Sequence, residues 1–141
     1  MYKAGRYDIK GKQHLKSLEK YYIVDIGLRK LLINKKHSDI GHILENIVYL
    51  ELIRRGYTVY IGKIGDLEID FIAERNNERK YYQVSVTILD ENTFKRERTP
   101  LKKVKDNFQK YIISMDEIDL SEDGIRHVNI LDFLQNTVQN K

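Results

Sequence analysis

The segments that decide the fold are Leu67-Glu68-Ile69-Asp70-Phe71-Ile72 and, after a polar turn, Tyr81-Tyr82-Gln83-Val84-Ser85-Val86. Both contain the β-branched and aromatic residues that favour strands. Each also places acidic or polar side chains where a buried strand is normally apolar. Because burying a polar group costs free energy unless it is hydrogen-bonded, these side chains need a partner or a function. The sequence therefore predicts two neighbouring strands that carry a polar site.

Side chains two positions apart in a strand face the same side of the sheet. Alternation through the first segment predicts that Glu68 and Asp70 share one face, with Ile69, Phe71 and Ala73 on the other.

The second segment places Gln83 and Ser85 on one face. If the two strands pair through the turn at 74–79, Asp70 and Gln83 are near neighbours across the ladder. A carboxylate and an amide oxygen can hold Mg²⁺, which keeps most of its waters. The alternative is that Asp70 is hydrogen-bonded by a backbone group or paired with a nearby lysine.

The composition predicts one globular domain with a real core. The chain has 141 residues, of which 41% are hydrophobic and 33% charged, as in soluble folded proteins. No apolar run approaches the ~20 residues that span a bilayer, and the first residues lack the apolar segment of a secretory signal. The absence of cysteine excludes disulfides and thiolate zinc sites. We expect a cytoplasmic protein without a membrane segment.

Positive charge is concentrated in two stretches. The net charge is +4; residues 1–22 hold six Lys/Arg and two acids, and residues 93–110 hold seven Lys/Arg and two acids. Residues 114–123 hold five acids and no base. The two basic stretches either follow a phosphate backbone or form ordinary solvated faces.

The N-terminal third is predicted to hold a hairpin and two helices. Strands at Arg6–Ile9 and Tyr21–Val24 form the hairpin, and Gly27–Leu32 is a short helix. A longer helix begins at an N-cap in Ser38-Asp39 and reaches Arg55, and Gly56 follows it as a left-handed C′ residue.

The rest of the chain alternates strands and helices. Three close strands predict an antiparallel meander, and a basic helix capped at 90–93 extends to about Phe108, with Pro100 expected to break or restart it. The expected elements are strands at 57–62, 67–74, 80–88, 111–115 and 126–130 and a last helix at 131–138. After the hairpin, this α-βββ-α-β-β-α order predicts an α/β fold with a mixed sheet and helices on both faces.

The helix residue Glu45, the motif Glu68-Ile69-Asp70-Phe71 and the motif Tyr82-Gln83-Val84-Ser85 together resemble the PD-(D/E)xK nuclease superfamily. More narrowly, the chain from Arg6 to Leu134 resembles an uncharacterised domain found C-terminal to AAA-type ATPase modules in prokaryotic proteins. The further motifs that carry this resemblance are Arg6-Tyr7-Asp8-Ile9-Lys10-Gly11, Lys20 to Arg29, Gly41 with Glu45-Asn46, and Thr93 with Arg96-Glu97.

The resemblance implies a restriction-endonuclease-like fold and a catalytic set. Asp70 and Gln83 would hold Mg²⁺ or Mn²⁺ with the Val84 carbonyl, and Glu45 would contribute directly or through a water. The superfamily's lysine activates the attacking water and offsets transition-state charge. Ser85 stands at that position, and its neutral hydroxyl supplies neither the charge nor a base.

Two functions therefore follow from the resemblance. The first is a nuclease-like, nucleic-acid-binding module of an AAA-type ATPase whose phosphodiesterase activity is weakened or lost. The second is a catalytically inactive interaction domain that docks on its ATPase partner. A lysine from elsewhere could fill the vacant position, and Lys63, Lys80 and Lys102 are candidates by their nearness in sequence.

The resemblance also divides the chain into a hairpin at 1–26 and a nuclease-like domain at 27–141. The hairpin would be the wing of an upstream winged-helix element, and it either touches DNA or packs on its neighbour. It also makes a dimer plausible. The candidate phosphate-binding side chains are Arg6, Lys10, Lys12, Arg96, Arg98 and Lys102.

The chain contains no Gly-x-x-x-x-Gly-Lys-[Ser/Thr] motif and so no P-loop for ATP. The ATPase module would lie upstream in the same polypeptide or on a separate protein. Glu51, on the apolar stripe of the long helix, is either a second acidic contributor or a partner in a structural hydrogen bond to the backbone. The four histidines, which show no ligand spacing, are expected at the surface: His14, His37, His42 and His127.

Overall fold

The structure is a computed structural model that describes residues 23–135. The chain divides into two compact units, one of residues 35–130 and one of residues 1–34 with 131–141. In the second unit, residues 23–32 are helical and Leu28 is buried. The expected hairpin, with Arg6, Lys10 and Lys12, lies outside the described residues except at its end. There the prediction of a strand is wrong, because Ile23 and Val24 are helical.

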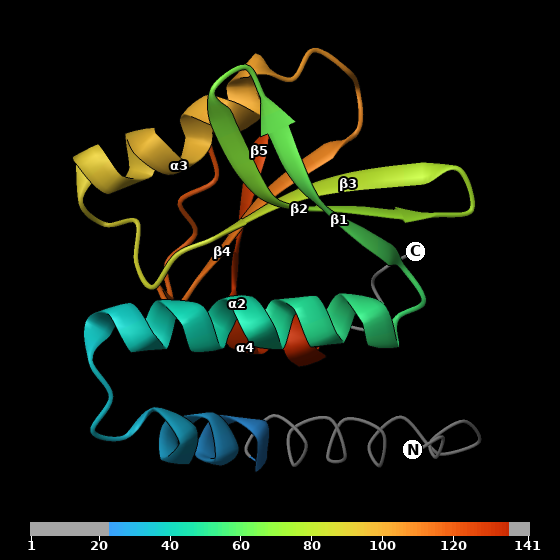
Figure 1. Ribbon diagram of the computed structural model, residues 1–141. Helices are drawn as coiled ribbons and strands as arrows, with labels where there is room; N and C mark the ends of the chain where they lie inside the picture. The colour runs from blue at the N-terminus through green and yellow to red at the C-terminus, as the bar shows by residue number, and fades with distance from the viewer. Residues whose placement is uncertain (1–22, 136–141) are drawn as a thin grey trace, which may run out of the picture. The chain divides into compact units, whose positions relative to one another are not determined.

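A five-stranded mixed sheet forms the unit of residues 35–130. The first three strands form the expected antiparallel meander, and the last two continue the sheet in parallel, in the order β1-β2-β3-β4-β5. Helices α2 and α3 cover opposite faces of this sheet (Figure 1). The predicted α/β class and mixed sheet are confirmed. The elements of this unit are α2 (His37–Arg54), β1 (Thr58–Ile64), β2 (Leu67–Arg75), β3 (Glu78–Val84), α3 (Glu91–Lys103), β4 (Gln109–Ser114) and β5 (Ile125–Asn129). The last helix, α4 (Ile130–Gln135), belongs from Leu131 on to the other unit.

Helix α2 buries an apolar stripe spaced as a helix requires. Leu44, Val48 and Leu52 are fully buried, at the i, i+4, i+8 spacing of one helical face. Gly56 has φ +92°, and it fills the left-handed position after the helix as predicted. The prediction of the N-cap is wrong. The helix begins at His37, one residue before Ser38, so Lys36 occupies the N-cap position and forms no side-chain cap.

A β-bulge interrupts β2 at Asp70. In the pairing with β1, Tyr60 lies opposite Ile72 but Gly62 lies opposite Ile69, so two residues of β2 face one residue of β1. Ile69 and Ile72 consequently pack in the same core, whereas Phe71 contacts Tyr49 of α2. The expectation that Ile69, Phe71 and Ala73 share a face is therefore wrong, because the bulge breaks the two-residue period.

Helix α3 begins at the expected cap and continues through its proline. The Asp90 carboxylate accepts a hydrogen bond from the Thr93 N–H at 3.0 Å, and the helix ends at Lys103 rather than near Phe108. Pro100 neither breaks nor restarts it, and both Pro100 and the following Leu101 are buried.

Under α3, the core joins both parts of the sheet. Its buried members come from β2, β3, β4, β5, α3 and the loop before α3: Ile69, Tyr81, Ile88, Phe94, Leu101, Ile112 and Ile125. Within residues 23–135, no helix has the length and apolar character needed to cross a bilayer.

Candidate functional site

The backbone pairing between β2 and β3 ends next to Asp70, and hydrogen bonds made by side chains connect the two strands beyond that point. The last paired residues are Phe71 and Tyr82. Beyond them, the Asp70 N–H donates to Gln83 Oε1 at 2.8 Å, and the Val84 N–H donates to Asp70 Oδ2 at 2.8 Å. Asp70 and Gln83 are thus neighbours as predicted, and the alternative that a backbone group hydrogen-bonds Asp70 holds as well.

Gln83 cross-links three elements. Its side-chain Nε2 donates to the Glu97 carbonyl of α3 at 2.9 Å, while its Oε1 accepts from β2. The residue is 3% exposed, and both ends of its amide are bonded to main chain. The oxygen keeps a second lone pair for a cation, but its first role in this structure is to position the strands and α3.

Three carboxylates gather where the strands part. Burial raises the pKa of Asp70 to about 6, with added repulsion from Glu45 and Glu68, although the Val84 N–H opposes the rise. Burial likewise raises the pKa of Glu97 to about 7, reinforced by Asp70 and Glu45, while Arg96 opposes the rise. These mutual repulsions indicate that carboxylates from α2, β2 and α3 lie near one another and form one acidic site.

Sequence reasoning missed Glu97 as a member of this site. A usable signal was present, because Glu97 lies three residues after Phe94 and four before Leu101, both buried. That spacing puts its carboxylate on the core face of an amphipathic helix. The side chain is only 16% exposed, and its nearest cation is Arg96, with 3.8 Å between Arg96 NH2 and Glu97 Oε2.

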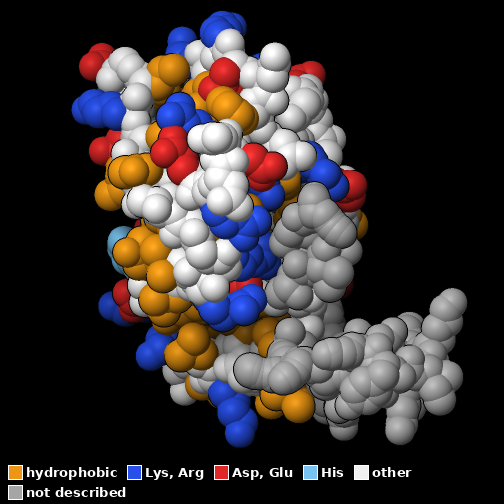
Figure 2. Space-filling view, turned by 90° about the vertical axis from the view of Figure 1, so that its right-hand side faces the viewer, with side chains coloured by type: hydrophobic (Ala, Val, Ile, Leu, Met, Phe, Trp, Pro, Cys, Tyr) orange, Lys and Arg blue, Asp and Glu red, His pale blue; other side chains and the backbone are white. Residues whose placement is uncertain are grey.

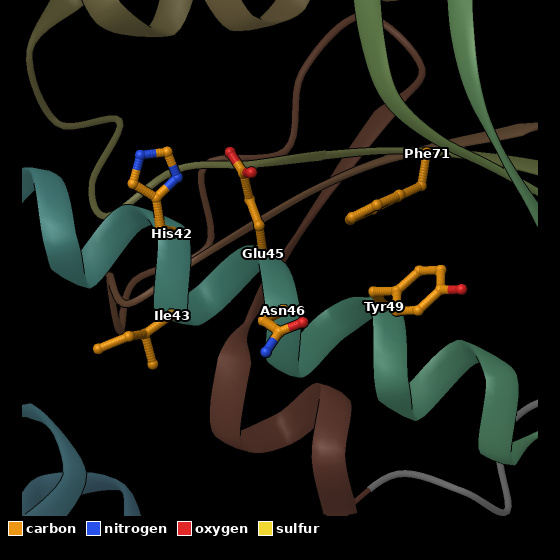
Figure 3. A pocket seen from close by; sticks show the side chains of 6 residues that line it. All are labelled: His42, Ile43, Glu45, Asn46, Tyr49 and Phe71. Carbon is orange, nitrogen blue, oxygen red and sulfur yellow. The ribbon is translucent and has the colours of Figure 1, made fainter.

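Glu45 extends from α2 toward the strands, beside a hollow (Figure 3). The hollow has a volume of about 490 Å³. The residues that line it are His42, Ile43, Glu45, Asn46, Tyr49 and Phe71.

Ser85 and the candidate lysines are engaged elsewhere. Ser85 Oγ donates to the Thr87 carbonyl at 3.0 Å. The Lys80 ammonium lies 5.6 Å from the centre of the Tyr57 ring, and Lys102 is paired with Asp123 at 3.3 Å. Lys63 is exposed on β1 and lies opposite Glu68.

The donor groups suit a hard divalent cation that keeps its waters. Among residues 23–135, no group of three His, Asp or Glu side chains forms a preformed metal centre. Asp70 Oδ1 receives no hydrogen bond from these residues. The Val84 N–H points at β2, and the next N–H, that of Ser85, donates to Ile113 of β4. Because the Val84 carbonyl lies opposite the Ser85 N–H in the same trans peptide, it also points toward β2, on the side of Asp70. Because Mg²⁺ commonly takes one or two carboxylates and several waters, Asp70 and Glu45 are sufficient protein donors.

The candidate phosphate-binding residues of α3 differ in their availability. Arg96 is 69% exposed. Arg98 is 13% exposed and engaged within the protein, by Glu91 at 3.1 Å and by the Phe94 ring. Arg96 is therefore more available to a phosphate than Arg98.

Another basic cluster lies at the end of the sheet where α2 ends and β2 turns into β3. Lys and Arg side chains gather there (Figure 2). The Arg75 guanidinium lies 4.4 Å from the centre of the Tyr57 ring and donates to the Arg55 carbonyl at 2.6 Å. Sequence reasoning did not single out this cluster, because its members come from separate elements.

Glu51 and His127 have structural partners, and those of Glu51 are arginine side chains and not the backbone group that was expected. The Glu51 carboxylate binds Arg54 at 2.6 Å and Arg55 at 2.8 Å, which lowers its pKa although burial opposes that shift. His127 is 8% exposed and its Nε2 lies 2.7 Å from Ser114 Oγ.

The expectation that all four histidines lie at the surface is thus wrong for His127, because its ring is held against Ser114 of the neighbouring strand. His37 and His42 are exposed as expected, and His14 lies outside the described residues.

The chain is similar to an uncharacterized protein of Haemophilus influenzae, with 46% identity over 134 residues. The match covers 94% of this chain and 33% of that protein, so the chain spans about a third of its relative's length. No known protein family matches the sequence. No solved structure matches it either.

Proposed function

We propose that this chain is a nuclease-like module of the PD-(D/E)xK kind that binds nucleic acid and retains weak or no phosphodiesterase activity. The observation that carries the proposal is the opening of β2 and β3 at Asp70, bridged by Asp70 and Gln83. That opening brings the half-buried Asp70 carboxylate together with Glu45 and Glu97 at one place.

The order of elements supports the same proposal. A helix carrying Glu45 precedes an antiparallel meander carrying Asp70 and Gln83, and α3 then leads to a parallel strand beside β3. An upstream or separate AAA-type ATPase module is part of the proposal. About two thirds of the Haemophilus influenzae relative lie outside the match, which leaves room for a further module of unspecified kind in that protein.

The reaction proposed is hydrolysis of a phosphodiester. A divalent cation, Mg²⁺ or Mn²⁺, would polarise the phosphate and favour deprotonation of water. The water oxygen forms a bond to phosphorus while the bond to the leaving oxygen breaks, and the water proton goes to a base. Glu97, with its pKa near neutrality, is the group of this site that can accept that proton at pH 7.

Ser85 limits the rate of this reaction. A lysine at its position would add a positive charge beside the developing phosphorane, and such a charge commonly contributes about 10²-fold or more. Arg96, the exposed cation beside Glu97, supplies part of that charge but no base. We therefore expect slow cleavage that depends on Asp70.

The test is an incubation of the purified chain with labelled branched, duplex and single-stranded DNA in Mn²⁺. Asp70→Asn keeps an oxygen for the Val84 N–H but removes the negative charge, so cleavage is expected to fall to background. Asp66→Asn, in the exposed turn before β2, is the matched control and should cleave like the natural chain. Equal cleavage by the Asp70→Asn and natural proteins would remove the site assignment.

A second function is favoured by the hydrogen bond from Ser85 to the Thr87 carbonyl, which fits a site that has lost its catalytic cation. In this case the chain is an inactive domain that docks on its ATPase partner. The same assay separates the possibilities. Salt-dependent DNA binding without cleavage indicates a nucleic-acid-binding pseudo-nuclease, and absence of both indicates the docking domain.

A further inference from the structure

The hollow beside Glu45 is built from one face of α2 and one residue of β2. His42, Asn46 and Tyr49 lie on successive turns of α2, and Phe71 closes the hollow from the sheet (Figure 3). The centres of the Tyr49 and Phe71 rings are 5.9 Å apart, with their planes tilted by 38°. Tyr49 is 39% exposed, so an aromatic surface remains open to solvent.

The chemistry of these walls fits a planar heterocycle. An aromatic ring offers a stacking surface to any nucleobase. The Asn46 amide both donates and accepts hydrogen bonds, and His42 adds a ring nitrogen, so the polar edge of a base can be paired. The hollow, of about 490 Å³, is largely open to solvent, so a base would stack against its aromatic wall and keep one side exposed.

The hollow lies beside the candidate metal site. Glu45 lines the hollow and so does Phe71, the residue that directly follows Asp70 in β2. A nucleotide whose phosphate lies at Asp70 therefore has its base near the hollow. Exposed Lys35 and Lys36 precede α2; Lys36 is six residues before His42, or about 9 Å along the helix, within reach of a neighbouring phosphate.

We propose that this hollow receives one unstacked base of a nucleic-acid strand, with Tyr49 as its stacking platform. The inference rests on the proposed nucleic-acid function and deepens it. A base held in a duplex is already stacked on its neighbours and cannot enter such a pocket without leaving the helix. The substrate class is therefore single-stranded or branched nucleic acid, in preference to continuous duplex.

The chain has no tryptophan, and Tyr49→Trp therefore introduces a single fluorescent reporter at the platform. Titration of the full chain with a twelve-nucleotide oligo(dT) in Mn²⁺ should quench this fluorescence. An abasic strand of the same length carries the same phosphates and should leave it nearly unchanged. The control is Tyr60→Trp on β1, an exposed site outside the hollow, where the two strands should give equal signals.

Affinity supplies a second readout, by fluorescence anisotropy of the labelled strands. Tyr49→Ala should weaken binding of oligo(dT) roughly fivefold to tenfold while leaving the abasic strand unaffected. Tyr49→Phe should retain the natural affinity because the ring remains. Since Tyr49 is partly exposed, the truncation is compatible with folding, and circular dichroism verifies this.

The outcomes separate this inference from the proposed function. Equal quenching of the Tyr49→Trp variant by the base-bearing and abasic strands overturns the base pocket, even if cleavage depends on Asp70. If the base-bearing strand quenches the fluorescence more than the abasic strand but no cleavage depends on Asp70, the base pocket is supported and only the proposed hydrolysis is overturned. A blue-shifted emission spectrum of the same variant that no strand alters would show the hollow filled by the protein itself, and would overturn the inference.

Discussion

At the residue scale, the two hydrogen bonds of the Gln83 side chain explain why position 83 holds an amide. Its Nε2 donates to the Glu97 carbonyl and its Oε1 accepts from the Asp70 N–H. Only a side chain with one donor and one acceptor end satisfies both groups. A carboxylate at this position would satisfy the Asp70 N–H but would set an oxygen against the Glu97 carbonyl.

We therefore predict that Gln83→Glu destabilises the chain at pH 8, by about 1–3 kcal/mol. The buried carbonyl loses its donor, and a charge is added beside Asp70. Urea unfolding monitored by circular dichroism measures the effect. Gln109→Glu, at the exposed start of β4, is the control for the added charge, and equal losses in the two variants would contradict the explanation.

Glu97 gives the second residue-scale prediction. Its folded-state pKa, about 7, lies above the ordinary value of 4.5, so the folded chain holds this proton to higher pH than the unfolded chain. Its contribution to stability is fully present below about pH 4.5 and is lost as the pH rises through 7. Asp70, with a pKa of about 6, acts in the same direction.

Glu97→Gln should therefore raise the melting temperature at pH 8 by several degrees, on the order of 1–2 kcal/mol, and change it little at pH 5. Thermal unfolding at both pH values measures this difference. Glu78→Gln, at the exposed start of β3, should have no such pH-dependent effect. A stabilisation equal at pH 5 and pH 8 would show that relief of buried charge is not the cause.

At the scale of elements, the bulge in β2 determines where the site lies. It changes the register between Tyr60 and Gly62, and it places Asp70 where β2 leaves β3. Gly62 permits this close approach, because a Cβ at this position would lie 2.9 Å from Ile72 Cδ1 and 3.1 Å from Ile69 Cβ. The Cδ1 atom of Ile72 lies at the end of a flexible side chain and can move, whereas the Cβ of Ile69 is held in place by the backbone of β2.

Gly62→Ala should consequently destabilise the chain by about 1–3 kcal/mol and weaken Mn²⁺ binding by displacing Asp70. Urea unfolding and the Mn²⁺-induced rise in melting temperature measure the two effects. Gly65→Ala is the comparison, since it has open space around its Cβ but a φ of +62°. The Gly65→Ala variant should lose stability through backbone strain but bind Mn²⁺ like the natural chain. If Gly62→Ala also bound Mn²⁺ like the natural chain, the bulge would not determine the geometry of the site.

At the scale of the whole molecule, His127 and the acidic site of Glu97 and Asp70 make stability depend on pH in opposite directions. His127 Nδ1 accepts the Leu120 N–H at 3.1 Å, which requires that nitrogen to be unprotonated. Its Nε2 contacts Ser114 Oγ, which donates to Asp116. Burial lowers the pKa of His127 below 6.5, although Asp116 and Asp119 oppose this shift. Stability from His127 is therefore present above about pH 6.5 and is lost as the pH falls through its folded-state pKa.

The acidic site gains stability over the range in which His127 loses it. We predict that the melting temperature falls less between pH 7 and pH 5 in the natural chain than in the Glu97→Gln chain. In that variant only Asp70 remains to oppose the loss from His127 as the pH decreases. The same fall in the two chains would exclude this compensation.

The sequence predicted those parts of the fold that depend on local patterns. The 3.6-residue period marked α2, Gly56 marked its end, and three β-rich segments separated by turns marked the meander. The N-cap at Lys36, the continuation of α3 through Pro100 and the burial of His127 were missed. Pro100 and His127 are buried, so tertiary packing stabilises the last two features against their local signals.

The same division applies to the site. The sequence by itself determined that acidic and amide side chains would stand on adjacent strands, because strand period and turn spacing are local properties. Only the tertiary structure decided that Gln83 bonds to the main chain of α3, that Glu97 joins Asp70 and Glu45, and that a hollow opens beside them. These features arise from a one-residue bulge and from the packing of helices on a sheet, and no local pattern encodes the contact between segments that are distant in sequence.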